Sequence, residues 1–116
     1  MSSSWDRDPV WFHGDVATGN LLVRDERLAG VLDFGSSGVG DPACDTVIAW
    51  TFLPVAARAR FRTDLGVDRG TWSRGRGWAL WKALISLVGH LERDAPEARA
   101  TRREIERILA DHAEER

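Results

Sequence analysis

The segment of residues 11–20, which reads Trp-Phe-His-Gly-Asp-Val-Ala-Thr-Gly-Asn, gathers several chemically capable side chains in one short stretch. It ends at Asn20, and a further polar group follows at Asp33, which begins the triplet Asp-Phe-Gly. Asn20 offers an amide oxygen and Asp33 a carboxylate. Mg²⁺ takes hard oxygen ligands of this kind and keeps waters or phosphate oxygens in its other positions. The pair therefore predicts a magnesium site for which one amide and one carboxylate suffice.

A β-hairpin accounts for the spacing between these two oxygen ligands. Apolar runs flank the polar segment 24–27, which is the pattern of two strands joined by a four-residue loop. With the turn centred on this segment, Asn20 pairs across from Val31, and Asp33 lies two residues further along on the same face. The two ligands are then expected to converge from neighbouring strands.

The rest of the chain is expected to be helical. Asp41-Pro42 supplies an N-cap and a first-turn proline for a buried helix over the apolar residues 47–53. Residues 54–65 predict a shorter helix that ends at a glycine, and residues 71–91 predict a longer one. A last amphipathic helix follows Pro96.

Spacings of three and four residues predict which sides of the last two helices face the core. In the longer helix the predicted core face consists of Trp78, Trp81, Leu84, Ile85, Val88 and Leu91. In the final helix it consists of Ile105, Ile108 and Leu109. The tryptophans are interpreted first as core residues and second as walls of a binding pocket.

Composition narrows the class of protein. A chain of 116 residues has the length of one modest domain. Sixteen basic and eighteen acidic side chains give a net charge of −2, which argues against a strongly basic nucleic-acid or anionic-membrane binder. Cys44 is the only cysteine, so an intrachain disulfide is excluded. We therefore expect a cytoplasmic protein that neither enters nor crosses a membrane.

The order of the polar residues resembles a known pattern. His13-x-Asp15, then Asn20, then Asp33-Phe34-Gly35 is similar to the catalytic and metal-binding loops of the protein-kinase-like fold. Residue 14 is Gly rather than Arg, and Gly-Asp-Pro-Ala-Cys-Asp follows at 40–45. With these features the chain resembles the aminoglycoside phosphotransferase family, over residues 10–84.

This resemblance implies a role for each matched residue. Asp15 would be the catalytic base or would position the acceptor hydroxyl. Asn20 and Asp33 would hold Mg²⁺, while His13 would be structural and Asp45 would anchor the catalytic loop. The implied reaction moves the γ-phosphoryl group of ATP or GTP to a hydroxyl of a small molecule such as an aminoglycoside, a chemistry of antibiotic resistance. The resemblance assigns no nucleotide-binding residues in this chain.

The resemblance also implies the fold and the domain organisation. We expect an α+β, predominantly helical structure that corresponds to the C-terminal lobe of a kinase-like phosphotransferase, with the metal ligands on a β-hairpin. Residues 1–116 are interpreted as a single partial domain, with catalytic and metal loops at 11–45 and a helical part at 46–116.

Family members also have an amino-terminal lobe whose strands and lysine bind the nucleotide phosphates. No segment before residue 10 of this sequence resembles that lobe. Lys82, the sole lysine, is not expected to substitute, because it lies far beyond the metal motif in a tryptophan-rich helix. The isolated chain is therefore expected to be inactive. Apolar surface around Trp11, Phe12 and Trp50 is expected to favour self-association or binding of the missing lobe.

Other interpretations remain open. The chain could be a non-catalytic remnant or interaction module that keeps the fold, and Asp15, Asn20 and Asp33 could be polar turn residues. Six arginines between residues 58 and 76 would fit a nucleic-acid surface, or else be solvated or paired. Asp45 is either a first-turn acid favoured by the helix dipole or a buried acceptor for loop amides.

Overall fold

The computed structural model describes residues 5–93 and 96–115. Helices dominate these residues and two small antiparallel sheets accompany them, so the predicted α+β, mostly helical class is confirmed. In chain order the elements are β1 (Val10–Phe12), the 3-10 helix η1 (Thr18–Asn20), β2 (Leu21–Arg24), β3 (Arg27–Val31), β4 (Gly38–Gly40), the 3-10 helix η2 (Pro42–Thr46), α1 (Ile48–Thr51), α2 (Val55–Leu65), α3 (Arg69–Glu92) and α4 (Glu97–Glu115).

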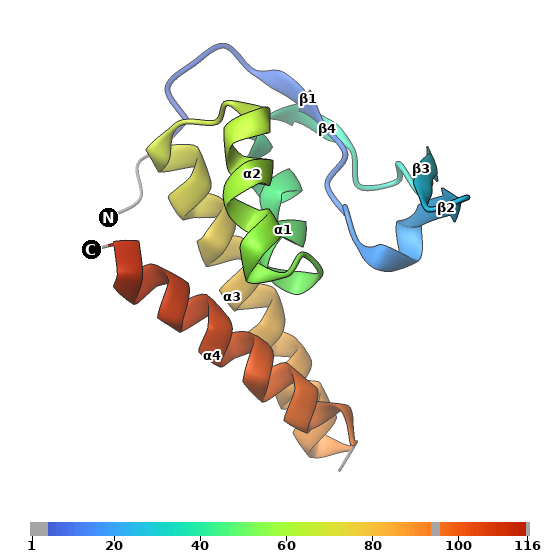
Figure 1. The fold of residues 1–116 in the computed structure, drawn as a ribbon, viewed down its shortest axis with the longest axis vertical. Coiled ribbons are helices and arrows are strands. Elements are labelled where there is room, and N and C mark those ends of the chain that lie inside the picture. Colours follow the sequence, from blue (N-terminus) through green and yellow to red (C-terminus); the bar gives the residue numbers. More distant parts are fainter. Residues whose placement is uncertain (1–4, 94–95, 116) are drawn as a thin grey trace.

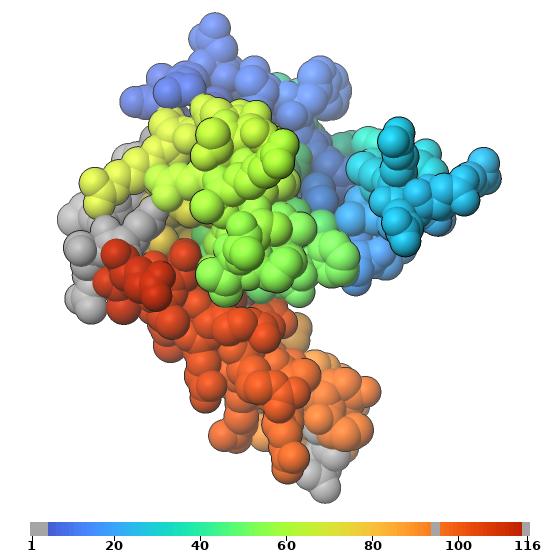
Figure 2. Space-filling view, viewed as in Figure 1, coloured from blue at the N-terminus to red at the C-terminus, as the bar shows by residue number. Residues whose placement is uncertain are grey.

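The elements divide into a helical body and a projecting hairpin. The long helices α3 and α4 lie side by side, and the shorter α1 and α2 pack beside the first half of α3 (Figure 1). β1 pairs with β4 to form a ribbon above the helices, and β2 pairs with β3. The β2–β3 hairpin stands clear of the helical body in the space-filling view (Figure 2). The segment between β1 and β2 therefore connects these two parts of the molecule.

The hairpin differs from its predicted register. Asp25 and Glu26 both have positive φ, 51° and 65°, so the strands are joined by a tight two-residue turn rather than a four-residue loop. The register then shifts between Leu22 and Val23, which leaves Ala29 unpaired as a bulge in β3.

The bulge moves the pairing beside the motif by one residue. The Leu32 amide donates to the Asn20 carbonyl oxygen over 2.7 Å, so the predicted pairing of Asn20 with Val31 is wrong. Asp33 follows directly, with φ of 59°. Its side chain is therefore placed by a left-handed backbone conformation and not by the alternation of a strand.

The core lies where α1, α3 and α4 meet. Trp50 and Trp72 contact each other with ring centroids 4.6 Å apart, and Ile108 of α4 is 1% exposed. The remaining buried members of this cluster are Val47, Ala49, Ala79 and Ala83. The prediction of a buried segment after Asp41-Pro42 is confirmed for Ile48, Ala49 and Trp50, whereas Phe52 is exposed.

The predicted core face of α3 is wrong. Its six large apolar side chains, Trp78, Trp81, Leu84, Ile85, Val88 and Leu91, are between 43% and 56% exposed. The side of α3 that faces the core is instead lined largely by small residues, among them Gly75, Ala79 and Ala83. Small side chains let neighbouring elements approach closely, and periodicity alone does not show which of two apolar faces is covered.

The other surface predictions had mixed outcomes. In α4, Ile108 is buried and Ile105 packs against the core, but Leu109 is half exposed. Trp11 is exposed as predicted, whereas Trp50 is one of the most buried side chains. No helix in the described ranges 5–93 and 96–115 combines the length and the apolar composition needed to cross a membrane.

A buried ionic network ties the four helices together. The Asp111 carboxylate accepts hydrogen bonds from Trp50 Nε1 at 3.0 Å, from Arg58 at 3.3 Å and from Arg76 at 3.2 Å. Arg58 also donates from Nε to the Ala49 carbonyl oxygen. Both arginine side chains are nearly buried. These two arginines therefore hold α2 and α3 to α4 and do not form a basic surface.

Two glycines of α3 test how closely this helix packs against η2. A methyl group at residue 75 would collide with Thr46 and lie 2.9 Å from the Ala43 carbonyl oxygen, whereas nothing lies within 4 Å of one at residue 77. We expect Gly75→Ala to lower the free energy of unfolding by about 1–3 kcal/mol through overpacking. Gly77→Ala should raise it by about 0.5–1 kcal/mol, because alanine has less freedom to lose in a helix. Urea unfolding of both variants measures the difference, and equal shifts would contradict the close contact.

Candidate active site

The loop of residues 13–15 is held by a carboxylate from η2. Asp45 accepts hydrogen bonds from the backbone amides of His13 and Gly14, at 2.8 Å each. η2 begins at Pro42, and the Asp41 side chain caps it by accepting from the Ala43 amide at 3.0 Å. The hydrogen bonds that the loop-anchor interpretation of Asp45 requires are thus present. They use one carboxylate oxygen for each amide.

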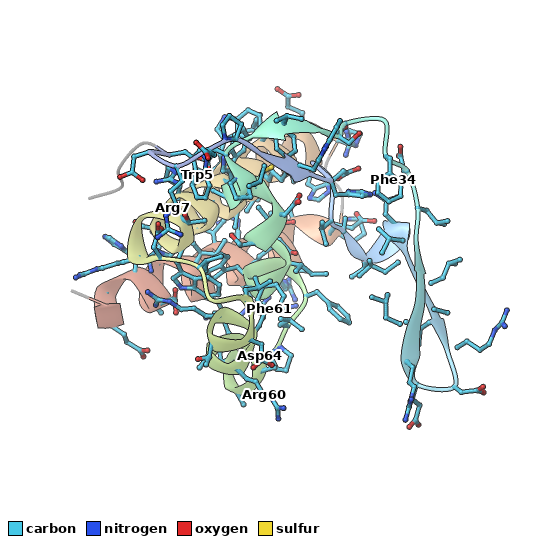
Figure 3. The ribbon with its side chains drawn as sticks, turned by 90° about the horizontal axis from the view of Figure 1, so that it is seen from above. Trp5, Arg7, Phe34, Arg60, Phe61 and Asp64 are labelled. Atoms are coloured by element: carbon cyan, nitrogen blue, oxygen red, sulfur yellow. The ribbon has the colours of Figure 1, made fainter. Side chains whose placement is uncertain are left out.

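His13 joins the same loop to the end of the hairpin. Its ring is nearly buried, and Nδ1 accepts from the Asp15 amide at 3.1 Å. This assigns the proton to Nε2, which donates to the Leu32 carbonyl oxygen at 2.8 Å. Phe34 packs edge-to-face on the ring, with centroids 4.6 Å apart, and lies at the base of the hairpin (Figure 3). Both ring nitrogens are occupied, as a structural histidine requires.

Gly14 brings this loop against the turn after Asp33. Its φ is 93°, a conformation that side chains with a Cβ rarely adopt. A Cβ at this position would collide with the backbone of Ser36. The loop that carries Asp15 and the turn that follows Asp33 are therefore in direct backbone contact.

Asp15 and Asn20 form a hydrogen-bonded pair. Asn20 Nδ2 donates to the Asp15 carbonyl oxygen at 2.8 Å and to Asp15 Oδ2 at 3.0 Å. Since Nδ2 is engaged on Asp15, the amide oxygen of Asn20 is the end left for a ligand. Asp33 lies beyond the hairpin in an exposed position, with one carboxylate oxygen 3.3 Å from the Gly35 amide. No hydrogen bond or ion pair in the described residues joins Asp33 to Asp15.

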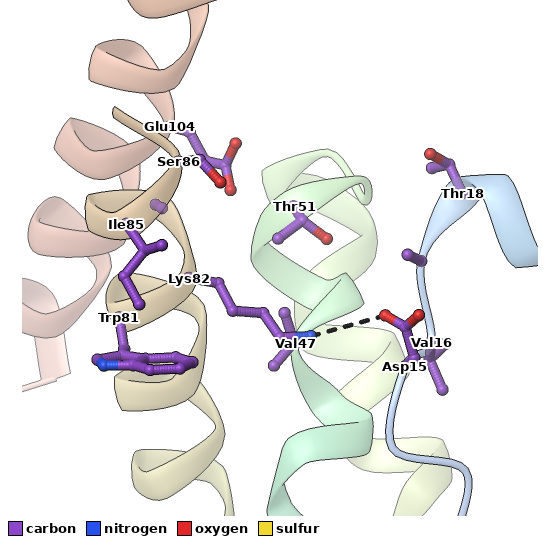
Figure 4. A pocket seen from close by; sticks show the side chains of 12 residues that line it. Asp15, Val16, Thr18, Val47, Thr51, Trp81, Lys82, Ile85, Ser86 and Glu104 are labelled. Carbon is purple, nitrogen blue, oxygen red and sulfur yellow. Dashed lines mark ion pairs between the residues drawn. The ribbon is translucent and has the colours of Figure 1, made fainter. Parts of the chain in front are cut away.

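Lys82 reaches the site from α3, although it lies far beyond the motif along the chain. Its Nζ lies 3.9 Å from Asp15 Oδ1 (Figure 4). The two side chains are 35% and 41% exposed. Sequence reasoning missed this contact, because 67 residues separate the partners and the only signal was that Lys82 is the sole lysine.

A cavity of about 460 Å³ opens beside Asp15 and Lys82. Its walls come from residues 15–18, from α1, from α3 and from Glu104 of α4 (Figure 4). Trp81 lines it, which agrees with the second interpretation of the tryptophans as pocket walls. Burial raises the pKa of Glu104 above its ordinary value, and the charge of Arg107 only partly offsets this effect.

Cys44 lies beside Asp45 in the sequence and is half buried. Its Sγ lies 3.9 Å from Asp45 Oδ1. Burial, reinforced by the negative charge of Asp45, raises the pKa of the thiol. Cys44 is therefore a protonated and weakly reactive thiol near neutral pH.

We expect Asp45→Asn to release the loop. The asparagine side chain keeps only one acceptor oxygen, so one of the amides at His13 and Gly14 loses its partner, at a cost of about 1–3 kcal/mol. Hydrogen exchange followed by NMR should show faster exchange of these two amides. Asp41→Ala is the matched control, because Asp41 caps η2 and pairs with Arg74 but does not contact the loop. Faster exchange at residues 13 and 14 in both variants would contradict a specific anchor.

Comparison with known proteins identifies the family. The profile of the phosphotransferase enzyme family matches residues 1–84, and the chain belongs to this family. The chain is 37% identical over 46 residues to an aminoglycoside 3'-phosphotransferase of Escherichia coli, and 37% identical over 62 residues to one of Niallia circulans. These matches cover 40% and 53% of the chain but only 17% and 21% of the relatives, about a fifth of their length. No solved structure matches the chain significantly.

Proposed function

We propose that this chain forms the part of a phosphotransferase site that binds the acceptor molecule. The proposed reaction transfers the γ-phosphoryl group of ATP or GTP to a hydroxyl of a small molecule such as an aminoglycoside. The observation that carries this proposal is the placement of Asp15. One of its carboxylate oxygens is held by Asn20, and the other faces a cavity large enough for a sugar-sized ligand. Family membership and the two aminoglycoside phosphotransferase relatives support it.

The proposed reaction is a direct displacement at the γ-phosphorus. The acceptor oxygen forms a bond to phosphorus while the bond from phosphorus to the β–γ bridging oxygen breaks, and the nucleoside diphosphate leaves. Asp15 orients the acceptor hydroxyl and accepts its proton. The hydrogen bond from Asn20 fixes the carboxylate, so less orientational freedom is lost when the acceptor binds.

The oxygen donors of Asn20 and Asp33 fit Mg²⁺, which prefers hard ligands and retains water and phosphate oxygens. Within the described residues no three His, Cys, Asp or Glu side chains form a metal cluster. The proposed site needs only one amide and one carboxylate, with nucleotide phosphates as the remaining ligands. Bound Mg²⁺ would neutralise phosphate charge. Asn20 and Asp33 alone leave most phosphate oxygens without donors, so we expect weak nucleotide binding by residues 1–116.

Paramagnetic line broadening tests the proposed metal ligands even when binding is weak. With Mn²⁺ in place of Mg²⁺ and ATP present, we expect the amide signals near Asn20 and Asp33 to broaden first. Asp33→Ala should abolish the effect. Asp25→Ala, which removes a carboxylate at the hairpin turn, should preserve it. Broadening that is centred elsewhere, or that survives Asp33→Ala, would overturn the metal assignment.

The alternative function is a non-catalytic interaction module, and one observation favours it. The exposed apolar residues of α3 form a stripe along most of a 24-residue helix, a feature typical of a surface that meets another protein. Nucleotide-dependent line broadening at Asn20 and Asp33 separates the two functions, because an interaction module has no need of these ligands.

A further inference from the structure

The two carboxylate oxygens of Asp15 have different surroundings. Oδ2 accepts from Asn20, on the side of the proposed metal ligands. Oδ1 faces the Lys82 ammonium at 3.9 Å, and both residues line the cavity (Figure 4). An acceptor hydroxyl that binds in the cavity therefore meets Oδ1, and the atoms next to that hydroxyl lie beside the Lys82 ammonium.

The ammonium group of Lys82 is placed to meet a ligand. Its distance of 3.9 Å from Asp15 Oδ1 is too long for a hydrogen bond, which requires about 2.7–3.2 Å, so the N–H donors of Lys82 are not used by Asp15. Both side chains line the cavity and are partly exposed. An oxygen atom of a bound acceptor can accept a hydrogen bond from Lys82 at this position.

The charges along the cavity differ from one end to the other. Near Asp15 the positive charge of Lys82 offsets the negative charge of the carboxylate. A protonated amine at this point is therefore attracted by Asp15 and repelled by Lys82. Glu104 lies farther along, near Ser86 (Figure 4), and the charge of Arg107 acts on it from outside the cavity lining. Among the described residues that line the cavity, Lys82 is the only cation. A cationic group of a ligand is therefore favoured near Glu104 and disfavoured next to the reacting hydroxyl.

We infer that Lys82 is a specificity residue, which selects acceptors with an oxygen substituent on the carbon next to the reacting hydroxyl over acceptors with a protonated amine there. This inference rests on the proposed function, since it assumes that the cavity holds the acceptor. It assigns Lys82 to recognition of the acceptor and not to the nucleotide.

A matched pair of ligands tests the inference through binding alone. Kanamycin A and kanamycin B differ at one carbon next to a sugar hydroxyl. This carbon carries a hydroxyl in kanamycin A and an amine in kanamycin B. Calorimetry at constant ionic strength gives the ratio of their affinities. We expect Lys82→Met to shift this ratio toward kanamycin B by about fivefold, the scale of one partly screened charge pair. Lys82→Arg keeps the charge and should leave the ratio unchanged.

Arg60→Met is the control for net charge, because Arg60 lies on α2 outside the cavity and its side chain is 86% exposed. It should not change the ratio. An unchanged ratio in Lys82→Met, an equal shift in Arg60→Met, or no binding of either ligand would overturn the inference. Lys82→Gln and circular dichroism check that a shift does not reflect loss of fold. The Mn²⁺ experiment tests metal and nucleotide binding at Asn20 and Asp33 and does not depend on Lys82. A failure of the proposed function can therefore be told apart from a failure of the inference about Lys82.

Discussion

Replacing Asp15 with Asn should lower the rate of phosphoryl transfer by about 10²–10⁴-fold in an active enzyme that contains this chain. Asparagine keeps the size of the side chain and an oxygen that can face Asn20, but it cannot take the proton of the acceptor hydroxyl. Affinity for the magnesium–nucleotide complex should remain nearly unchanged, because Asp15 is not one of the proposed metal ligands. Steady-state kinetics and nucleotide calorimetry measure the two effects separately.

Asn20→Ala and Asp33→Ala are the comparison variants, and both should weaken nucleotide binding. Asn20→Ala should also lower turnover, because it removes the hydrogen bond that orients Asp15. If Asp15→Asn reduced nucleotide affinity as much as it reduced the rate, Asp15 would act on the nucleotide side of the site. The assigned division between acceptor and metal residues would then be wrong.

The largest effect on stability is expected for Asp111→Ala. This change leaves the guanidinium groups of Arg58 and Arg76 buried without their shared carboxylate, at a cost of about 3–5 kcal/mol. Asp64→Ala is the matched control, because Asp64 pairs with Arg60 on the outer side of α2, where both side chains are exposed (Figure 3). It should change the free energy of unfolding by less than about 0.5 kcal/mol. Similar urea midpoints for the two variants would contradict a buried network.

The same network gives a pH dependence. Burial by itself raises the pKa of Asp111, but the hydrogen bonds from Trp50 and Arg76 and the charges of Arg58 and Arg76 outweigh it and lower the pKa below its ordinary value. The stabilisation is therefore complete above the ordinary aspartate pKa and is lost as the pH falls through the lowered one. Wild-type protein should lose more stability on acidification than Asp111→Ala, which has no such carboxylate to protonate.

Local signals allowed parts of the fold to be predicted. The end of α2 followed from Gly66, whose φ of 67° is the left-handed conformation that glycine adopts at helix ends. The cap at Asp41 followed from the proline after it. The polar residues within 13–20 could be recognised as a candidate site because the motif is defined by their spacing along the chain. In each case the determining contacts lie within a few residues of one another.

Long-range contacts could not be predicted in the same way. The pairing of Lys82 with Asp15 depends on how α3 packs against η2, which a small residue at position 75 permits but does not specify. The Asp111 network joins residues up to 61 positions apart and has no periodic pattern. The predicted hairpin register was wrong for a local reason. The tight turn and the bulge at Ala29 each depart from the simplest strand pairing.

The exposed apolar face of α3 also affects the temperature dependence of stability. Unfolding raises the heat capacity mainly by transferring apolar surface from the interior to water. The six large apolar side chains of this face, the first Trp78 and the last Leu91, already have about half of their surface in water in the folded chain, so they contribute correspondingly less to that transfer. The heat capacity change should thus fall below the usual 12–15 cal/mol/K per residue, roughly 1.4–1.7 kcal/mol/K for a chain of this length. A smaller change flattens the stability curve and moves cold unfolding further below the freezing point of water.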